Sequence, residues 1–366
     1  MWEDSNGQSG SRSPRSTTRR RVLQTGAVTT GIAIAGCLNG SGDSLTFISR
    51  GGTTQEAERE KFEEWSEESG IEVTHQEAAG DTEILNLIAE NPDAFDFTNP
   101  SSSGLTLHRS QYDGELFADI DYDHLPNYRE NIQEEWQNSP AIDGHDDGIF
   151  YYISTQGIGY NRDQVDEITT WEDIKDDGLE GTVALIDNAQ VRFGNACAAL
   201  EYDTGEAATD DAMFEDVIAE MEEQHTNVFG YWTAGNEFMQ LMREDQAYVA
   251  SAWGGRVQVM NKDGYNVEYV IPDEGCVAHT NYFSIVENSD KKEDVYDLLD
   301  WLYDTENAIE LSTRHNYPIP ITDPPEELTS LFEYVDHPDD LTWIDWPAVL
   351  SERERIIERF NEIKSL

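Results

Sequence analysis

Apolar residues near the start of the chain alternate between short continuous runs and runs with a helical period. Residues 45–49 form a short apolar run, which is typical of a buried strand. Residues 54–69 follow with apolar side chains at helical spacing, and the expected core positions are Ala57, Phe62 and Trp65. A strand is expected again at 71–75 after Gly70 ends the helix. This alternation of strand and helix predicts a parallel α/β sheet with ligands at the carboxyl ends of its strands.

The same alternation continues toward the C-terminus. A long apolar segment at 148–160 predicts a strand with a break at 156–157. Beyond it, we expect strands at 182–186, 248–252, 267–271 and 277–286. Helices are expected at 82–90, 189–202, 212–225, 237–244, 293–303, 307–314 and 347–366. Because some 330 residues exceed a comfortable single core, these elements predict two lobes.

The N-terminal segment has the pattern of an export signal. Arg19 and Arg20 precede an uncharged run at 26–36 that is too short to cross a bilayer, for which about 20 residues are needed. The residues 34–37, Ile-Ala-Gly-Cys, are similar to a lipobox ending at Cys37. We therefore predict a twin-arginine signal peptide at 1–36 and a lipidated Cys37 with its linker at 37–44, which places the protein on the outer face of the membrane. A plain membrane anchor, or cleavage elsewhere, is the alternative.

Acidic residues dominate the composition. The chain has 75 Asp and Glu against 23 Lys and Arg, a net charge of −52. Five basic and two acidic residues precede Cys37, which leaves 18 basic and 73 acidic residues beyond the signal and a net charge of −55. Self-repulsion on this scale is weakened by molar salt, so the charge indicates a halophilic protein. Nucleic acids and anionic membrane surfaces are poor partners for it.

Motifs for metal or redox chemistry are missing from the sequence. It contains no CxxC or HExxH motif, and we expect no structural metal and no cofactor. Cys197 and Cys276 can pair in an oxidising exterior, but two buried thiols are the preferred expectation. The acidic segment 143–148 is similar to a calcium loop, although a solvated turn is the commoner structure for such a segment.

Several ordered segments resemble one family. They are FISRGGTTQEAEREKFEEWSEESGIEV, DFTNPSSSG, YYISTQGIGYNRDQV, TTWEDI, GTVALIDNAQVRF, AYVASAWGG, IPDEGCVAHTNYFSIVENS and HNYPIP. They are similar to the extracellular solute-binding subunits of ABC importers, in particular the spermidine/putrescine-binding branch. The resemblance covers roughly residues 45–335. The resemblance implies a monomer without catalytic residues that delivers a small solute to a membrane permease served by a separate cytoplasmic ATPase.

The resemblance also implies a fold. It is the two-lobed, periplasmic-binding-protein-like α/β fold of type II, with the ligand held between lobes that are joined by crossover strands. Lobe 1 is expected at 45–153 and 280–320, lobe 2 at 154–279, and a C-terminal helical segment at 321–366. The crossover positions are expected around 154–159 and 279–284. Closure around the ligand is then a hinge motion.

Residues for the ligand site follow from the same resemblance. Polyamine binders of the family hold ammonium groups with carboxylates and methylene chains with aromatic rings. Two family acids align with Asn188 and Val191, and a family Trp and Asp align with His279 and Asn281. The predicted ligand-binding residues are Ser101, Ser103, Tyr152, Asn188, Arg192, Trp253, Arg256, His279 and Asn281. Because neutral residues replace three acids while Arg192 and Arg256 lie nearby, the ligand is expected to be neutral or anionic as readily as a polyamine.

Two other functions stay open. Tyr152, Tyr282 and His279 are candidates for part of an iron site, as in related ferric-binding proteins. A secreted α/β hydrolase that uses His and carboxylate acid–base chemistry is the alternative from a different class. The sequence has no G-x-S-x-G motif, which disfavours the hydrolase.

Overall fold

Two long strands connect two groups of shorter strands in the computed structural model, which describes residues 44–137, 146–331 and 338–366. The predicted signal peptide, Cys37 and nearly all of the linker lie outside the described residues, as does half of the acidic segment 143–148. Among the described residues, Asp147 of that segment is paired with His108 and Arg109. No described helix has the length and apolar character needed to span a bilayer.

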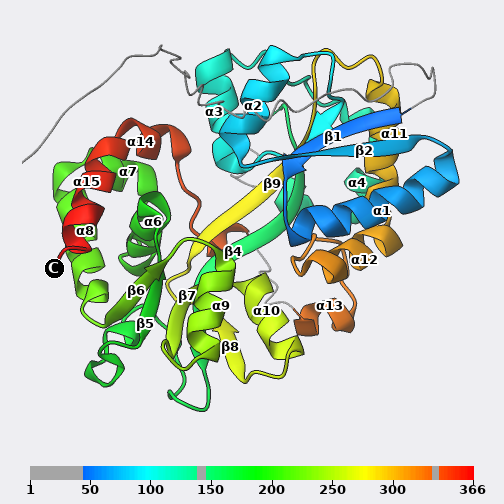
Figure 1. The fold of residues 1–366 in the computed structure, drawn as a ribbon. Helices are drawn as coiled ribbons and strands as arrows, with labels where there is room; N and C mark the ends of the chain where they lie inside the picture. The colour runs from blue at the N-terminus through cyan, green and yellow to red at the C-terminus, as the bar shows by residue number, and fades with distance from the viewer. Residues whose placement is uncertain (1–43, 138–145, 332–337) are drawn as a thin grey trace, which may run out of the picture. The chain divides into compact units, whose positions relative to one another are not determined.

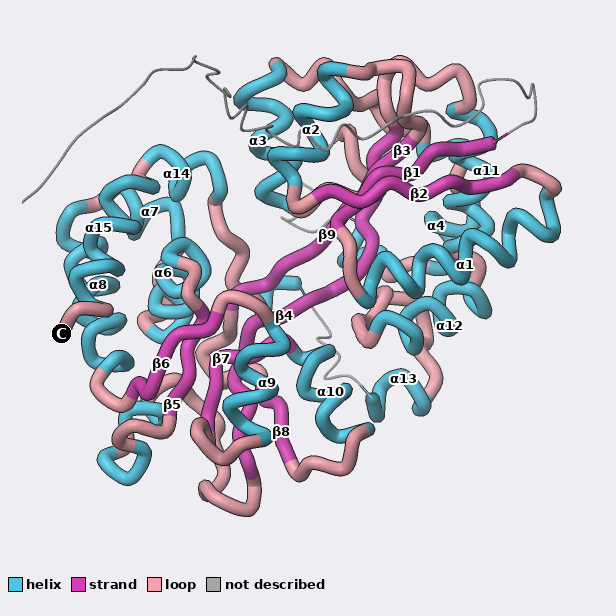
Figure 2. Tube along the Cα trace, viewed as in Figure 1, coloured by secondary structure: helices cyan, strands magenta, loops and turns pink. Residues whose placement is uncertain are grey.

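The described strands form one mixed sheet in the order β2-β1-β3-β9-β4-β7-β5-β6, with β8 paired to β4 (Figures 1 and 2). Lobe 1 contains β1 (Ser44–Arg50), β2 (Glu72–Ala78) and β3 (Phe97–Thr98). Lobe 2 contains β5 (Val183–Ile186), β6 (Val228–Trp232), β7 (Val249–Trp253) and β8 (Val267–Val270). The short strands of each lobe pair mainly in parallel, as predicted, but every pairing of the two long strands is antiparallel.

The long strands β4 (Ile149–Asn161) and β9 (Val277–Ile285) run from one lobe into the other. The predicted break at 156–157 is wrong, because β4 is continuous and only its partners change there. Its first half pairs with β9, and from Gln156 onward it pairs with β7 and then β8. Gly157 permits this crossing, since a Cβ atom at that position would lie 2.3 Å from the Val270 carbonyl oxygen.

Helices surround the lobe 1 strands. They are α1 (Thr53–Ser69), α2 (Asp81–Glu90), α3 (Ser102–Tyr112), α4 (Pro126–Asn131), α5 (Glu134–Gln137), α11 (Lys292–Leu302), α12 (Thr305–His315) and α13 (Glu326–Leu331). The predicted core positions Ala57, Phe62 and Trp65 of α1 are buried. Gly70 ends this helix in a left-handed conformation, as its lack of a side chain favours.

Lobe 2 is built from α6 (Ala189–Ala199), α7 (Thr204–Thr209), α8 (Asp211–His225), α9 (Gly235–Arg243) and α10 (Gly254–Lys262). The chain ends in α14 (Trp346–Ser351) and α15 (Arg353–Ile363), which pack on α6, α7 and α8 of this lobe. The sequence predicts one helix at 347–366, whereas the structure has two that meet at Glu352. The inner face of this helix pair is formed by three buried side chains, Val349, Ile356 and Phe360.

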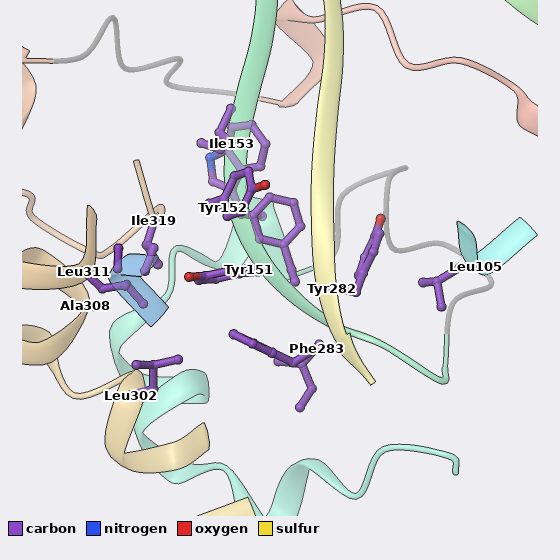
Figure 3. Packing of buried hydrophobic residues seen from close by; sticks show 14 of the residues in the cluster. Leu105, Tyr151, Tyr152, Ile153, Tyr282, Phe283, Leu302, Ala308, Leu311 and Ile319 are labelled. Atoms are coloured by element: carbon purple, nitrogen blue, oxygen red, sulfur yellow. The ribbon is translucent and has the colours of Figure 1, made fainter. Parts of the chain in front are cut away.

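Two hydrophobic clusters form the core. The larger one occupies lobe 1 and continues along β4 and β9, where Figure 3 shows the Tyr151 ring among Phe283, Leu311 and Ile319. The smaller one lies in lobe 2 and includes Cys197 of α6. Cys197 is a buried free thiol, so it does not form a disulfide with Cys276.

Candidate functional site

A cavity of about 430 Å³ lies between the two lobes, beside the crossover strands. This volume is in the usual range for sites that bind small molecules. Eight of the nine predicted site residues line it, namely Ser101, Ser103, Tyr152, Asn188, Trp253, Arg256, His279 and Asn281. The crossover strands β4 and β9 supply three of these eight, and loops or helix starts at the strand ends supply the others.

Five helices that each follow a strand of the sheet have their N-termini at this cavity. The lining includes the first turn, or the residues just before it, of α1, α3, α6, α9 and α10. The parallel strands place these helix starts together, because each helix begins where a strand of the sheet ends. Backbone N–H groups and the positive ends of the helix dipoles therefore point toward the cavity, which favours negative charge there.

The lobe 2 wall of the cavity consists of Asn188, Val191, Gly235, Trp253 and Arg256. The Asn188 side chain caps α6, with its Oδ1 atom accepting from the Val191 N–H at 3.1 Å. The Arg256 guanidinium forms no ion pair with any residue that the structure describes. This wall contains no Asp or Glu, so its formal charge is positive.

The lobe 1 wall consists of Arg50, Gln55, Glu58, Asn99, Ser101 and Ser103, with Gly51 and Thr54 beside them. Arg50 lies 3.8 Å from Asp81, which neutralises its charge. The Ser101 hydroxyl donates to Asp81 at 2.5 Å and its oxygen caps α3 by accepting from the Gly104 N–H at 3.2 Å. The cationic group of this wall is therefore already paired within the protein.

Glu58 is the one acid among the described residues that line the cavity. Its side chain is fully buried, and its Oε1 atom accepts from Asn99 Nδ2 at 2.7 Å. Burial raises the pKa of the Glu58 carboxyl to about 8, against the opposing effects of Tyr151, Asn99 and Arg50. The carboxyl is consequently neutral in much of the free protein at pH 7.

Aromatic side chains border the cavity between the two walls. Tyr152 and Tyr317 stack with ring centroids 5.2 Å apart. Trp253 packs edge-on against His279, with centroids 4.9 Å apart. Burial, and to a lesser extent Arg50, lower the pKa of His279 to about 4, so this imidazole is neutral at physiological pH. These rings offer apolar faces to the carbon skeleton of a solute.

Comparison with known proteins identifies the family. The model of the bacterial extracellular solute-binding proteins matches residues 59–330. The chain belongs to this family. The spermidine/putrescine-binding periplasmic protein of Salmonella typhimurium is 26% identical over 306 residues, 82% of this chain and 84% of that protein.

Solved structures confirm the two-lobed type II fold of these solute-binding proteins. The spermidine/putrescine ABC transporter substrate-binding protein PotD of Streptococcus pneumoniae has a TM-score of 0.76 at 20% identity, over 88% of this chain and 99% of that one. AgtB of A. tumefaciens R10, solved in complex with agropinic acid, has a TM-score of 0.65 at 17% identity, over 88% and 99% of the two chains. The family match favours a solute-binding protein over the hydrolase that the sequence left as an alternative.

Arg192 is the predicted site residue that does not line the cavity. It follows Val191 on α6, and the helix turns its side chain into the interior of lobe 2, where it is 1% exposed. Its Nη2 atom contacts Gln224 Oε1, and its guanidinium lies 5.9 Å from the Trp171 ring centre. Burial lowers the pKa of Arg192 to about 10. Arg192 thus belongs to the packing of the lobe.

The structure adds cavity residues that sequence comparison missed, chiefly Arg50, Gln55, Glu58, Tyr317 and Trp346. The first three lie in the segment ISRGGTTQEAE, where 3.6-residue periodicity places Gln55 and Glu58 on the buried face of α1. Two polar residues on an apolar helix face were the available signal. Trp346 reaches the cavity only because the C-terminal segment folds back, which no local pattern indicates.

Iron binding finds no support in this arrangement. Tyr282 does not line the cavity that contains Tyr152 and His279. No three His, Cys, Asp or Glu side chains gather as a metal site within residues 44–137, 146–331 and 338–366. The chemistry that the cavity offers is charge and hydrogen-bond recognition of a small solute.

Proposed function

We propose that this protein is the extracellular receptor of an ABC importer and that its cargo is a small organic solute with at least one anionic group. The observation that carries the proposal is Arg256, a cavity-lining cation without a carboxylate partner. Nine other described arginines are paired with Asp or Glu. In a chain with 75 acidic residues, a cation left unpaired in a cavity is available to a ligand.

The helix starts support the same charge preference. A carboxylate near Arg256 would also meet the N-terminus of α10, whose first residue is Gly254. Each such helix end contributes about 0.3–1 kcal/mol to a nearby anion. The capped N-terminus of α6 lies on the same wall. An anionic group bound against lobe 2 is thus favoured by a side chain and by the backbone together.

A diamine fits the lobe 2 wall poorly. The curated relatives are named for spermidine and putrescine, which are cations. An ammonium group placed there would meet Arg256 and no acid, because Asn188 and Val191, which the resemblance aligns with two family acids, are neutral. The structural relative AgtB, which binds agropinic acid, shares the fold alone, yet it shows that this fold is compatible with an acidic ligand.

A thermal-shift comparison tests the proposal. The purified full chain in molar KCl is heated with dicarboxylates and with diamines of equal chain length. A ligand at about 100 times its dissociation constant stabilises the folded state by about 2.7 kcal/mol, which raises the unfolding midpoint measurably. We expect dicarboxylates to raise the midpoint more than diamines. A larger shift with putrescine or spermidine would overturn the proposal.

Delivery to the membrane completes the proposed role. We propose that the chain leaves the cell by the twin-arginine route, is lipidated at Cys37, and works as a monomer beside a separate permease and ATPase in a halophilic organism. The support is the sequence of residues 19–37 and the net charge of −52. Cys37→Ser should release the protein into the medium while Arg19→Lys with Arg20→Lys should retain it inside. Membrane attachment of the Cys37→Ser variant would contradict lipid anchoring.

A further inference from the structure

The lobe 1 wall presents two buried polar atoms that have no partner in the described part of the protein. They are Gln55 Nε2 and Glu58 Oε2. Their side chains are 1% and 0% exposed, and both line the cavity. The two residues are three positions apart on α1, so they lie on the same face of that helix. A buried polar group without a partner destabilises the protein, and a ligand that supplies the missing hydrogen bond removes this cost.

Once it has lost its proton, Glu58 needs a donor rather than an acceptor. Its Oε1 atom already accepts from Asn99 Nδ2 at 2.7 Å, which favours the acceptor form of the carboxyl group. The hydroxyl of the buried Tyr151 also lowers the pKa of this carboxyl and so favours its ionised form. An ammonium group offers three donors and no acceptor, and the stacked pair Tyr152 and Tyr317 in the same cavity provides faces that attract a cation.

We propose that Glu58 is the recognition site for a ligand amino group, so that the cargo is an amino acid with its ammonium group at lobe 1 and its anionic group at lobe 2. This proposal rests on the proposed function, which assigns the anionic group to Arg256. Gln55 Nε2 supplies a donor to an oxygen atom of the same ligand. The cargo is thereby distinguished both from a diamine and from a dicarboxylate.

Charge compensation leads to the same ligand class. Arg50 is neutralised by Asp81, which leaves two groups for a ligand to compensate: Arg256, and Glu58 once its carboxyl has lost its proton. A diamine would leave one ammonium against Arg256, and a dicarboxylate would leave one carboxylate against Glu58. An amino acid pairs with both groups. Because the carboxyl of Glu58 gives up its proton when an ammonium binds beside it, binding near neutral pH also releases a proton to the solvent.

The experiment compares three matched ligand series in two variants. Diamines, α,ω-amino acids and dicarboxylates of equal length, from short to long, are titrated calorimetrically into the full chain in molar KCl. The test variant is Glu58→Gln and the control is Glu56→Gln, the same change at an exposed position of the same helix. Titrations in two buffers of different ionisation enthalpy report the proton release.

We expect an amino acid to bind most tightly, with proton release, and Glu58→Gln to weaken it at least tenfold and abolish that release. Glu56→Gln should change neither. If dicarboxylates bind best and Glu58→Gln does not weaken them, the proposed function stands and the Glu58 site is wrong. If only diamines bind, the anion-binding function is wrong, and with it the amino-acid cargo. If no series binds, both proposals fail. An amino acid bound equally by Glu58→Gln and wild type would leave Tyr151 as the partner of Glu58 and overturn the site.

Discussion

The two walls of the cavity differ in whether their charged side chains are already paired within the protein. On lobe 1, Arg50 is paired with Asp81. The carboxyl of Glu58 is buried there, and of its two oxygen atoms only Oε1 has a hydrogen bond among the described residues. On lobe 2, Arg256 has no carboxylate partner among the described residues, and the wall contains no acid. The chain shares the fold and the order of its segments with the family, while the aligned positions Asn188, Val191 and Asn281 are neutral. A shared fold therefore does not fix the cargo, because a few side chains on each wall decide it.

The acid in the cavity lies away from the positions that the resemblance indicated. Alignment places neutral residues at Asn188, Val191 and Asn281, and the structure confirms that these three line the cavity. An acid, Glu58 of α1, nevertheless lines the opposite wall of the cavity. Among the described residues that line the cavity, the one acid is therefore on lobe 1, while the unpaired Arg256 is on lobe 2.

The largest expected effect is the change with pH in the free energy of unfolding that the Glu58 carboxyl causes. Burial raises its pKa to about 8, whereas the ordinary value is 4.5. Between these values the folded protein holds a proton that the unfolded chain has lost, so the free energy of unfolding falls as pH rises through this window. The loss is about 1.4 kcal/mol per pH unit, a few kcal/mol in all. Chemical denaturation of wild type and Glu58→Gln at several pH values in molar KCl measures it.

Charged and polar groups facing Glu58 do not reverse this sign. They are Asn99, Tyr151 and Arg50, each of which acts to lower the pKa of the carboxyl, and desolvation outweighs them. His279 titrates near pH 4, below most of the window. Glu58→Gln should remove the slope that Glu58 contributes and leave the remaining pH dependence unchanged. Parallel curves for wild type and variant would mean that the carboxyl is ionised in the free protein.

The next largest effect concerns Arg256 on the opposite wall. Arg256→Gln removes the charge and keeps a donor, so an anionic ligand should lose about 2 kcal/mol, which is about thirtyfold in affinity. The matched control is Arg243→Gln, which changes an arginine of α9 that pairs with Asp263 outside the cavity. Calorimetry with the tightest ligand of the matched series provides the measurement. Equal losses in both variants would point to a general charge effect of lobe 2 rather than direct contact.

Much of the fold could be predicted because local patterns determine it. Periodicity located α1, α2, α8, β1 and β9 nearly to the residue. It failed at β4, where a break was expected at 156–157, because close packing against Tyr269 and Val270 requires Gly157 inside a continuous strand. The short helices α4, α5 and α7 were missed, since six residues or fewer contain too little periodic signal.

The site was predictable where it coincides with family motifs and unpredictable elsewhere. Eight residues that the resemblance indicated meet in space, because five lie at strand ends and helix starts and three lie on the crossover strands β4 and β9. Arg192 was misassigned because the sequence does not show whether a side chain beside Val191 faces the cavity or the interior. Glu58 escaped notice because one glutamate among 75 acidic residues is conspicuous only once its burial is known.

The smallest effect expected comes from returning an acid to the lobe 2 wall by Asn188→Asp. Aspartate caps a helix as well as asparagine does, so the bond from the Val191 N–H is kept and the unfolding midpoint should not change. The new carboxylate lies on the wall that contains Arg256 and reduces its attraction for an anionic group by about 1 kcal/mol, about fivefold in affinity. Asn188→Ser, which caps without charge, is the control. The affinity for diamines should rise in Asn188→Asp and not in Asn188→Ser. It should rise further in the double variant Asn188→Asp with Arg256→Gln, because both walls then favour ammonium groups. If Asn188→Asp leaves the preference between the matched ligands unchanged, the asymmetry between the walls resides in Arg256 and Glu58 alone.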